Sequence, residues 1–402
     1  MSSERKIRVA VVFGGRGPEH AVSCMGAGSM LRWIDRERYE VVPVGITRDG
    51  RWVLAADEPS RLEAAGRELP SVESVAKPGS QVVPWAAPGS QNVPPAEPGS
   101  QPVRQPGPAG SAIATSAPAH IPHLLGEVDV VLPVLHGPFG EDGTLQGLLE
   151  TAGIRYVGAG VLSSAVSMDK EYMKLIFAAK GLPVAPHVVV RERDWQPGEA
   201  ATTADPERKR VLDAIAELGW PLFVKPARGG SSIGTSKAYN ADQLEQAILT
   251  ARSYDPKVLV EAAVDGAEVE CAVLEGLDGG PPDTSIPCQL VIRGGEEFYD
   301  FEAKYLDEAT DIVIPAPIPG EAIQEVRAMA AAAFTAASCE GLARVDFFYT
   351  PDGQVLVNEI NTIPGLAPMS GFPRMWEASG LPFPALIDRL LQTALRKRPG
   401  LR

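Results

Sequence analysis

The sequence predicts an α/β protein with three domains, the first of which is built on a parallel sheet. Two observations support this prediction. Residues 7–13 and 128–135 are near-continuous apolar runs, as expected for strands buried on both faces of a parallel sheet. Strand-like and helix-like segments also alternate from residue 211 to about residue 396. A chain of 402 residues is long enough for two or three domains, and we place the boundaries near residues 160 and 262.

The first domain, residues 1–160, begins with a strand, a glycine turn and a helix. The apolar strand over 7–13 is ended by the glycine-rich residues 14–18. Residues 19–33 then have apolar side chains at helical spacing, and a second strand is expected over 40–47. Strands that alternate with helices in this way are typical of an α/β sheet.

A low-complexity insertion is expected within this domain, over about residues 71–119. The sequence Pro-Gly-Ser-Gln recurs every ten residues, at Pro78, Pro88 and Pro98, and few aromatic or branched apolar residues accompany it. Proline removes a backbone donor and disfavours regular ladders. We therefore interpret the segment as extended or disordered and without a catalytic role. A segment that docks a partner is the alternative.

Ordered structure is expected to resume with the buried strand over 128–135, which ends in the turn HGPFGEDG and is followed by a helix over 144–150. In the central domain, residues 161–262, we expect a helix over 170–180, because glycine and proline follow it directly. A polar loop is expected over 195–208. The third domain, residues 263–402, completes the alternation of strands and helices.

Composition excludes several classes of protein. The formal net charge is −14, so the chain is a poor candidate for nucleic-acid binding, which requires a basic surface. No apolar run approaches the roughly 20 residues of a membrane span, and the polar N-terminus leads into a strand and not into a secretory signal. We expect a cytoplasmic protein without membrane or nucleic-acid partners. The cysteines are widely separated and form no CxxC motif, which predicts buried, reduced thiols and no zinc site.

A loop of small residues, KPARGGSSIGTSK at 225–237, follows a short apolar strand. Glycine and serine let a backbone approach a phosphate closely, and successive N–H groups form an anion site. Gly229 and Gly234 have the spacing of a P-loop, but Thr235 stands where the phosphate-binding lysine should be, so we reject that class. Lys225 precedes the loop instead. A flexible surface loop is the alternative interpretation.

Residues 341–349 and 354–361 are predicted to form two strands joined by a Pro-Asp-Gly turn. With a four-residue loop, Tyr349 pairs with Gln354. Four polar side chains then project to one face: Arg344, Asp346, Glu359 and Asn361. Three oxygen ligands and a guanidinium suit Mg²⁺ and phosphate. A three-residue loop with a glycine bulge would shift the register by one and separate the carboxylates, and a solvated charged face is a further alternative.

Three other segments contain residues that suit catalysis or ligand binding. Residues 364–371 form a rigid loop whose backbone N–H groups suit an oxyanion hole. The aromatic and charged run over 298–305 is either a strand or a lid that brings Lys304 to a phosphate. The opening glycine turn misses the dinucleotide fingerprint, because His20 stands where the third glycine should be. His136 lies at a strand end in a glycine turn, which is a favourable position for function.

Taken together, these residues resemble the D-alanine–D-alanine ligase family of ATP-grasp enzymes. The matching motifs run in one order over residues 7–47 and 128–391. They are FGGR at 13–16 with EH at 19–20, LHGPFGEDGT at 135–144, MDK at 168–170, KP at 225–226 with GSSIG at 230–234, EAKY at 302–305, RVD at 344–346, and NEINT at 358–362 with PG at 364–365. The resemblance implies a three-domain ATP-grasp architecture with a Rossmann-like N-terminal domain, a small central α+β domain and a C-terminal α+β domain.

The resemblance also implies the residues that bind ATP and metal. The implied ATP ligands are Lys170, Lys225, Ser231, Ser232, Glu261, Glu268 and Lys304. The lysines would bind phosphates, with Lys304 on the γ-phosphate, and the two glutamates would take the adenine and ribose ends. Two Mg²⁺ ions, or Mn²⁺ as the alternative, would be held by Asp346, Glu359 and Asn361.

The implied catalytic set is Glu19, Ser231, Tyr305, Arg344 and Gly365. The ammonium of the first D-alanine would lie on Glu19 with His136 nearby, and Ser370 would help to bind the second D-alanine. Glu19, Ser231 and Tyr305 would form a hydrogen-bonded set that closes the site. Arg344 and the N–H of Gly365 would stabilise the oxyanion.

The implied reaction has two steps and serves peptidoglycan precursor synthesis. The first D-alanine carboxylate attacks the γ-phosphate and forms an acyl phosphate and ADP. The deprotonated amine of the second D-alanine then attacks the carbonyl, and phosphate leaves. The resemblance further implies a homodimer. Two features depart from the family pattern: Ala21 follows the Glu-His pair where many members have an acid, and the Pro-Gly-Ser-Gln insertion has no counterpart.

The sequence leaves three alternative functions. A ligase that joins D-alanine to D-lactate is disfavoured by Tyr305, since relatives that make this product usually have another residue there. A non-catalytic ATP-binding regulator is disfavoured because all three implied metal ligands are present. A nicotinamide oxidoreductase rests only on the incomplete glycine fingerprint.

We predict that the substitution Tyr305→Phe raises ester formation relative to amide formation, because the tyrosine is the residue that separates the two product classes. Mass spectrometry of the product formed from a mixture of D-alanine and D-lactate measures this ratio. An unchanged ratio would refute the assignment.

Overall fold

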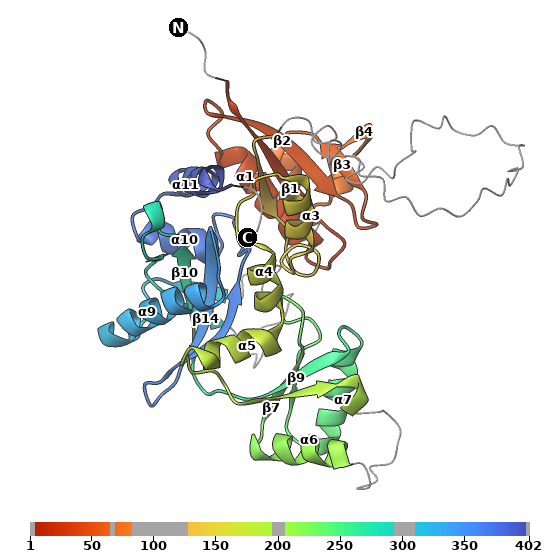
Figure 1. Ribbon diagram of the computed structural model, residues 1–402, viewed down its shortest axis with the longest axis vertical. Helices are drawn as coiled ribbons and strands as arrows, with labels where there is room; N and C mark the ends of the chain where they lie inside the picture. Colours follow the sequence, from red (N-terminus) through yellow and green to blue (C-terminus); the bar gives the residue numbers. More distant parts are fainter. Residues whose placement is uncertain (1–4, 65–68, 83–127, 195–205, 293–309, 399–402) are drawn as a thin grey trace, which may run out of the picture.

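The structure is a computed structural model that describes residues 5–64, 69–82, 128–194, 206–292 and 310–398. These residues form three sheets, each covered by helices and arranged along the long axis of the molecule (Figure 1). The predicted run over 298–305, with Lys304 and Tyr305, lies outside the described residues, as does most of the predicted insertion.

The first sheet has the strand order β4-β3-β2-β1-β5. Its strands are β1 (Ile7–Gly14), β2 (Tyr39–Ile46), β3 (Trp52–Ala55), β4 (Ala76–Val82) and β5 (Val130–Val134). β1 is parallel to both β2 and β5, which confirms the predicted parallel sheet. Side chains of β1 alternate between two cores: Val11 packs with α1 (His20–Trp33), whereas Val12 packs with α3 (Thr144–Ala152). This two-sided burial explains the apolar run.

Residues 71–82, predicted as the start of the irregular insertion, are folded, and that part of the prediction is wrong. They form the short helix η2 (Val72–Ser74) and the strand β4, which pairs with β3. Val72 is fully buried. β4 lies at the edge of the described sheet, and its ladder is irregular between Val53 and Ala55. An edge position tolerates Pro78, because the outer side of the strand needs no backbone donor.

The second sheet is antiparallel, with the strand order β6-β9-β7-β8. Its strands are β6 (His187–Arg191), β7 (Leu222–Pro226), β8 (Ser236–Ala238) and β9 (Lys257–Ala262), and its helices are α6 (Pro206–Glu217) and α7 (Ala241–Arg252). These helices and strands share a core of their own. The predicted loop over 195–208 ends early, since α6 begins at Pro206 and proline is well suited to a first helical turn.

The third sheet is also antiparallel and has the order β13-β12-β10-β14-β15, with β11 paired to β10. Its strands are β10 (Ala267–Leu274), β11 (Asp283–Thr284), β12 (Cys288–Ile292), β13 (Thr310–Val313), β14 (Leu342–Tyr349) and β15 (Val355–Asn361). The helix α9 (Gly320–Ala336) packs on this sheet, next to α4 (Val161–Met168) and α5 (Lys170–Ala179). α5 is the helix predicted over 170–180, and its Met173 and Phe177 join the third core rather than the second.

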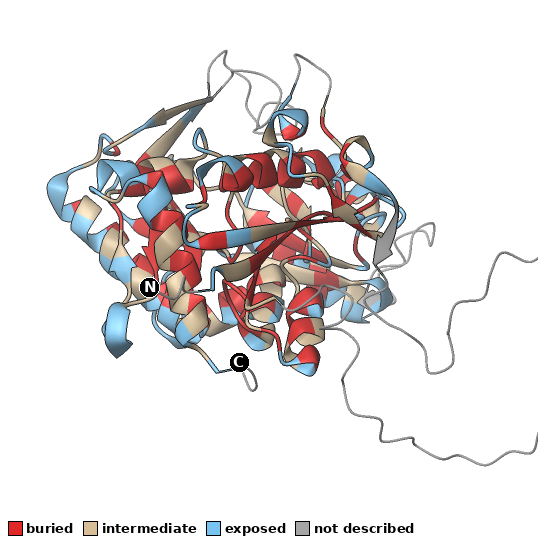
Figure 2. Cartoon of the chain, turned by 90° about the horizontal axis from the view of Figure 1, so that it is seen from above, coloured by how far each residue is buried: buried red, intermediate tan, exposed pale blue. Residues whose placement is uncertain are grey.

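The last two helices, α10 (Gly371–Ala378) and α11 (Phe383–Arg396), connect the third sheet to the first. Leu386 and Leu390 of α11 belong to the same core as Val9 and Met30, and α11 lies beside α1 (Figure 1). Buried residues lie on the inward sides of the helices and strands, whereas exposed residues lie on the outward faces of the helices (Figure 2).

The prediction that the thiols are buried is confirmed. All four thiols are unpaired and buried, and burial raises the pKa of Cys24 to about 12. Among the described residues, no helix combines the length and the apolar character that crossing a membrane requires.

We predict that Val72→Ala lowers the free energy of unfolding by about 2 kcal/mol, since it removes two buried methyl groups and leaves a cavity. The side chain packs directly on the backbone of β1 and β2, where a Cβ added at Gly14 would lie 2.5 Å from Val72 Cγ2. Urea unfolding measures the loss. Val291→Ala, at an exposed position of β12, is the matched control and should change stability by less than about 0.5 kcal/mol. Equal losses would show that η2 is not part of the core.

Candidate functional site

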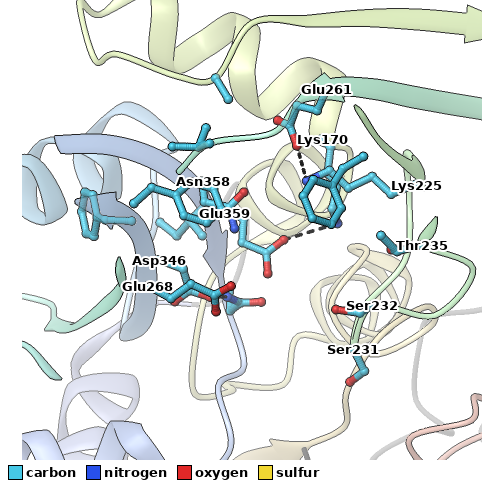
Figure 3. A pocket seen from close by; sticks show the side chains of 18 of the residues that line it. Lys170, Lys225, Ser231, Ser232, Thr235, Glu261, Glu268, Asp346, Asn358 and Glu359 are labelled. Atoms are coloured by element: carbon cyan, nitrogen blue, oxygen red, sulfur yellow. Dashed lines mark hydrogen bonds and ion pairs between the residues drawn. The ribbon is translucent and has the colours of Figure 1, made fainter. Parts of the chain in front are cut away.

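A cavity of about 520 Å³ lies between the second and third sheets. It brings together most of the residues predicted to bind nucleotide and metal, together with Arg344, which was predicted to stabilise the oxyanion: Lys170, Lys225, Ser231, Ser232, Glu261, Glu268, Arg344, Asp346, Glu359 and Asn361. Carboxylates of the third sheet stand on one side of the cavity, and the serine loop that follows β7 stands on the other (Figure 3). The loop with Ser231 and Ser232, which we call the serine loop, therefore faces the carboxylates of Asp346 and Glu359, which we call the acidic wall, across one cavity.

The lysines lie between these two sides. Lys225, near the end of β7, forms an ion pair with Glu261 of β9. Lys170 is the first residue of α5, and its Nζ donates to the Gly229 carbonyl at 2.8 Å. The same Nζ lies 3.4 Å from Glu359 Oε2 (Figure 3). Lys170 thus connects the loop that follows β7 to the acidic wall.

The hairpin that forms the acidic wall does not have the preferred four-residue loop, and that prediction is wrong. Tyr349 pairs with Val355, the Thr350 N–H donates to the Gln354 carbonyl at 3.0 Å so that residues 351–353 form the loop, and Gly353 has φ +86°. This is the alternative register, with a three-residue loop and a glycine in the left-handed conformation. In a regular ladder this register would place Asp346 and Glu359 on opposite faces.

A β-bulge restores the carboxylates to one face. The register shifts between Phe347 and Asp346, so that Asn358 is an extra residue and Asp346 faces Glu359. Arg344 then faces Asn361. The four polar side chains consequently share the face that the sequence predicted, although the pairing that places them there differs.

The carboxylate of Asp346 in the acidic wall is neutralised by the guanidinium of Arg344. The Arg344 guanidinium donates to both carboxylate oxygens of Asp346, at 2.7 and 2.6 Å, and lies 3.2 Å from Glu270 Oε1. Burial alone would lower the pKa of Arg344, but the charges of Asp346 and Glu270 raise it well above its usual value. Asn361 donates its side-chain amide to Asp346 at 2.9 Å.

Glu19 lies where the first sheet meets the serine loop. It is buried, and the Ser231 hydroxyl donates to its carboxylate. Two glycines enclose the carboxylate: a Cβ added at Gly137 would collide with Oε2, and one added at Gly230 would lie 2.9 Å from it. Glu19 and Ser231 are therefore in the contact that the family resemblance implied.

Glu141 is a site residue that the sequence analysis did not assign, although it lies in the HGPFGEDG turn. Its carboxylate accepts hydrogen bonds from the N–H groups of Gly137, at 2.8 Å, and Ile363, at 2.9 Å. The loss of solvation, and then the charge of Glu19, raise its pKa to about 8. His136 Nδ1 lies 3.0 Å from the Ile363 carbonyl oxygen. The turn is thus fastened to the residues that follow β15.

Two other predicted residues, Gly365 and Ser370, are not among the residues that line the cavity. Gly365 and Ser370 adjoin each other, since a Cβ added at Gly365 would lie 3.0 Å from Ser370 Oγ. Within the described part of the chain, no group of three or more His, Cys, Asp or Glu side chains is placed to hold a metal ion. The predicted metal ligands are instead two carboxylates and one amide.

Comparisons with known proteins cover nearly the whole chain. Residues 8–159 match the family model described as "D-ala D-ala ligase N-terminus", and residues 176–392 match "D-ala D-ala ligase C-terminus". A D-alanine–D-alanine ligase of Streptomyces avermitilis is 51% identical over 400 residues, which is 99% of this chain and 96% of the relative. The enzyme of the same name from Streptomyces coelicolor is 52% identical over 397 residues, which is 98% of this chain and 95% of the relative.

Two solved structures are also similar to this chain. A D-Ala:D-Ser ligase from Enterococcus faecalis superposes with a TM-score of 0.74 at 30% identity and covers 97% of this chain and 100% of its own. The D-alanine–D-alanine ligase from Coxiella burnetii gives a TM-score of 0.68 at 29% identity, with 97% and 94% coverage.

We predict that stability falls as pH rises toward 9 and that Glu141→Gln removes this part of the dependence. The folded pKa of Glu141, about 8, exceeds its ordinary value of 4.5. The stabilisation is therefore complete below the lower pKa and is lost as pH rises through the higher one, at about 1.4 kcal/mol for each unit of pKa difference. Urea midpoints between pH 5 and pH 9 measure the slope.

The control for this experiment is Glu40→Gln, at an exposed position of β2, whose pH profile should follow the parent protein. A Glu141→Gln profile parallel to that of the parent would contradict the assignment of the raised pKa to Glu141.

Proposed function

The chain belongs to the D-alanine–D-alanine ligase family, and from this premise we propose which of its residues perform the reaction. It is an ATP-dependent ligase that joins two D-alanine molecules for peptidoglycan synthesis. One observation supports the residue assignment more than any other. Lys170 and Lys225 line the same cavity as Asp346 and Glu359, as binding of a metal–triphosphate complex requires.

ATP is proposed to bind between the serine loop and the acidic wall. Lys170 and Lys225 now neutralise carboxylates, and phosphate oxygens would take over this role. The backbone of Ser231 and Ser232, both at positive φ, would form the loop over the phosphates. Glu261, near the end of β9, and Glu268, near the start of β10, would bind the adenine and ribose ends, and Lys304 would reach the γ-phosphate.

The metal ligands proposed for two Mg²⁺ ions, with Mn²⁺ as the alternative, are Asp346, Glu359 and Asn361. Their donor set fits, because all three offer oxygen atoms on one face and the two carboxylates are now charge-matched by Arg344 and Lys170. When bound, the metal supplies charge neutralisation for the phosphoryl group being transferred.

D-Alanine is proposed to bind beside the serine loop. Glu19, with Glu141 behind it, would receive the ammonium of the first D-alanine, and His136 would lie nearby. Two neighbouring carboxyl groups in a buried site favour a cation between them. Ser370 would help to bind the second D-alanine, and Tyr305 would complete the closing set with Glu19 and Ser231.

The chemistry follows from these positions. The carboxylate of the first D-alanine attacks the γ-phosphorus, the bond to the β-phosphate oxygen breaks, and an acyl phosphate and ADP result. The deprotonated amine of the second D-alanine then attacks the carbonyl carbon. Arg344 and the Gly365 N–H would stabilise the oxyanion before phosphate leaves. Exclusion of water protects the acyl phosphate from hydrolysis. We further propose a homodimer that works in the cytoplasm.

We predict that the protein releases phosphate from Mg-ATP only when D-alanine is present and that mass spectrometry detects the dipeptide. A well-folded protein without D-alanine-dependent release would instead favour a non-catalytic ATP-binding regulator.

In the same assay, Glu19→Gln should lower kcat/KM for D-alanine by about 10- to 100-fold, because the substrate ammonium loses a charged hydrogen-bond partner. The KM for ATP should change much less. Glu40→Gln, a surface substitution of the same kind, should leave both parameters unchanged. An equal loss in the two variants would argue against the role of Glu19.

A further inference from the structure

A second lysine on α5 lies behind the wall of the cavity. Lys174 follows Lys170 by one helical turn, so the two side chains leave α5 on the same side. Lys174 is fully buried and does not line the cavity, whereas its two partners, Glu261 and Asn358, do. Its Nζ lies 2.5 Å from Glu261 Oε1 and donates to the Asn358 carbonyl oxygen at 3.4 Å.

These contacts join three separate elements of the site. Glu261 belongs to β9 of the second sheet, and its other oxygen is paired with Lys225. Asn358 is the bulge residue of β15, directly before Glu359. The Lys174 ammonium group therefore contacts both Glu261, which pairs with Lys225, and Asn358, the bulge residue that orients the acidic wall.

The charge balance shows why a lysine is needed here. Burial alone would raise the pKa of Glu261, but the charges of Lys225 and Lys174 lower it to about 2. If a neutral residue replaced Lys174, Lys225 would be the remaining cation beside the buried carboxylate of Glu261. The ion pair between Lys225 and Glu261 would then strengthen, and Lys225 would be less available to a ligand in the cavity. A buried cation that served packing alone would be replaceable by an apolar side chain of similar length.

We propose that Lys174 is a positioning residue for nucleotide binding: it shares Glu261 with Lys225, so that Lys225 remains available to phosphate, and it fixes the Asn358 bulge that directs Glu359 into the cavity. This inference rests on the proposed function, in which the cavity binds ATP. Lys174 does not touch the nucleotide itself, so it acts through its two partners.

The test compares Lys174→Met with Lys397→Met. Lys397 is also a largely buried lysine with two carboxylate partners, Glu275 and Glu340, and none of the three lines the cavity. Calorimetric titration with Mg-ADP, without D-alanine, should show a loss of affinity of about 10- to 100-fold for Lys174→Met and none for Lys397→Met. The KM for ATP should rise, while the KM for D-alanine should not.

Two further measurements separate positioning from general stability. Amide exchange at residues 357–361 should become faster in Lys174→Met and stay unchanged in Lys397→Met. The losses of ADP affinity caused by Lys174→Met and Glu261→Gln should be clearly less than additive in the double variant, because one acts through the other. If Lys174→Met does not fold, Lys174→Gln replaces it, with the same loss of affinity expected.

Parental ADP affinity in folded Lys174→Met, an equal loss in Lys397→Met, or additive effects with Glu261→Gln would each overturn the inference. Failure of the proposed function has a different signature, namely no D-alanine-dependent phosphate release by the parent protein. The nucleotide titration remains decisive for Lys174 in that case, since it contains no D-alanine.

Discussion

A single extra residue in β15, Asn358, determines the chemistry that the third sheet presents to the cavity. Side chains alternate strictly along a strand, so a shift of one position exchanges its two faces. The glycine turn at Gly353 sets a register that would separate Asp346 from Glu359, and the bulge reverses that separation. Both carboxylates then lie on the same face of the sheet, where Glu359 pairs with Lys170 and Asp346 with Arg344. The acidic wall therefore depends on an irregularity in the pairing of β14 and β15.

The cavity of this acidic protein is lined by cations as well as carboxylates, and the cations are held in position by the carboxylates. Lys170, Lys225 and Arg344 each contact at least one carboxylate of the cavity lining. Removal of one member of such a buried pair leaves an uncompensated charge, which is strongly unfavourable. An anionic ligand that brings its own cations exchanges one set of ion pairs for another and avoids that cost. The net charge of −14 is therefore compatible with an anionic ligand.

The sequence was sufficient to predict those features of the fold and site that depend only on residues close together in the chain. Apolar runs identified the buried strands, and alternation identified which side chains of the hairpin share a face. The bulge was not predictable, because Asn358 is an ordinary strand residue and its role appears only in the pairing with β14. The burial of Val72 depends on distant backbone at Gly14 and Gly45. Lys174 had a weak signal, its position one turn after Lys170, but its burial depends on how α5 packs.

That packing makes α5 the joint between the second and third sheets. Its body is anchored in the third core by Met173 and Phe177. Its N-terminus is capped by Asp169, which accepts from the first-turn N–H groups and also pairs with Lys257 of β9. The Lys170 N–H donates to the carbonyl of Ala227, in the segment that leads to the serine loop, at 2.9 Å. Any change in the distance between that loop and the acidic wall must strain these contacts. The distance between the serine loop and the acidic wall, which a bound triphosphate would span, is consequently set by α5. Lys170 of this helix contacts the acidic wall from inside the cavity, and Lys174 contacts the bulge residue Asn358 behind it.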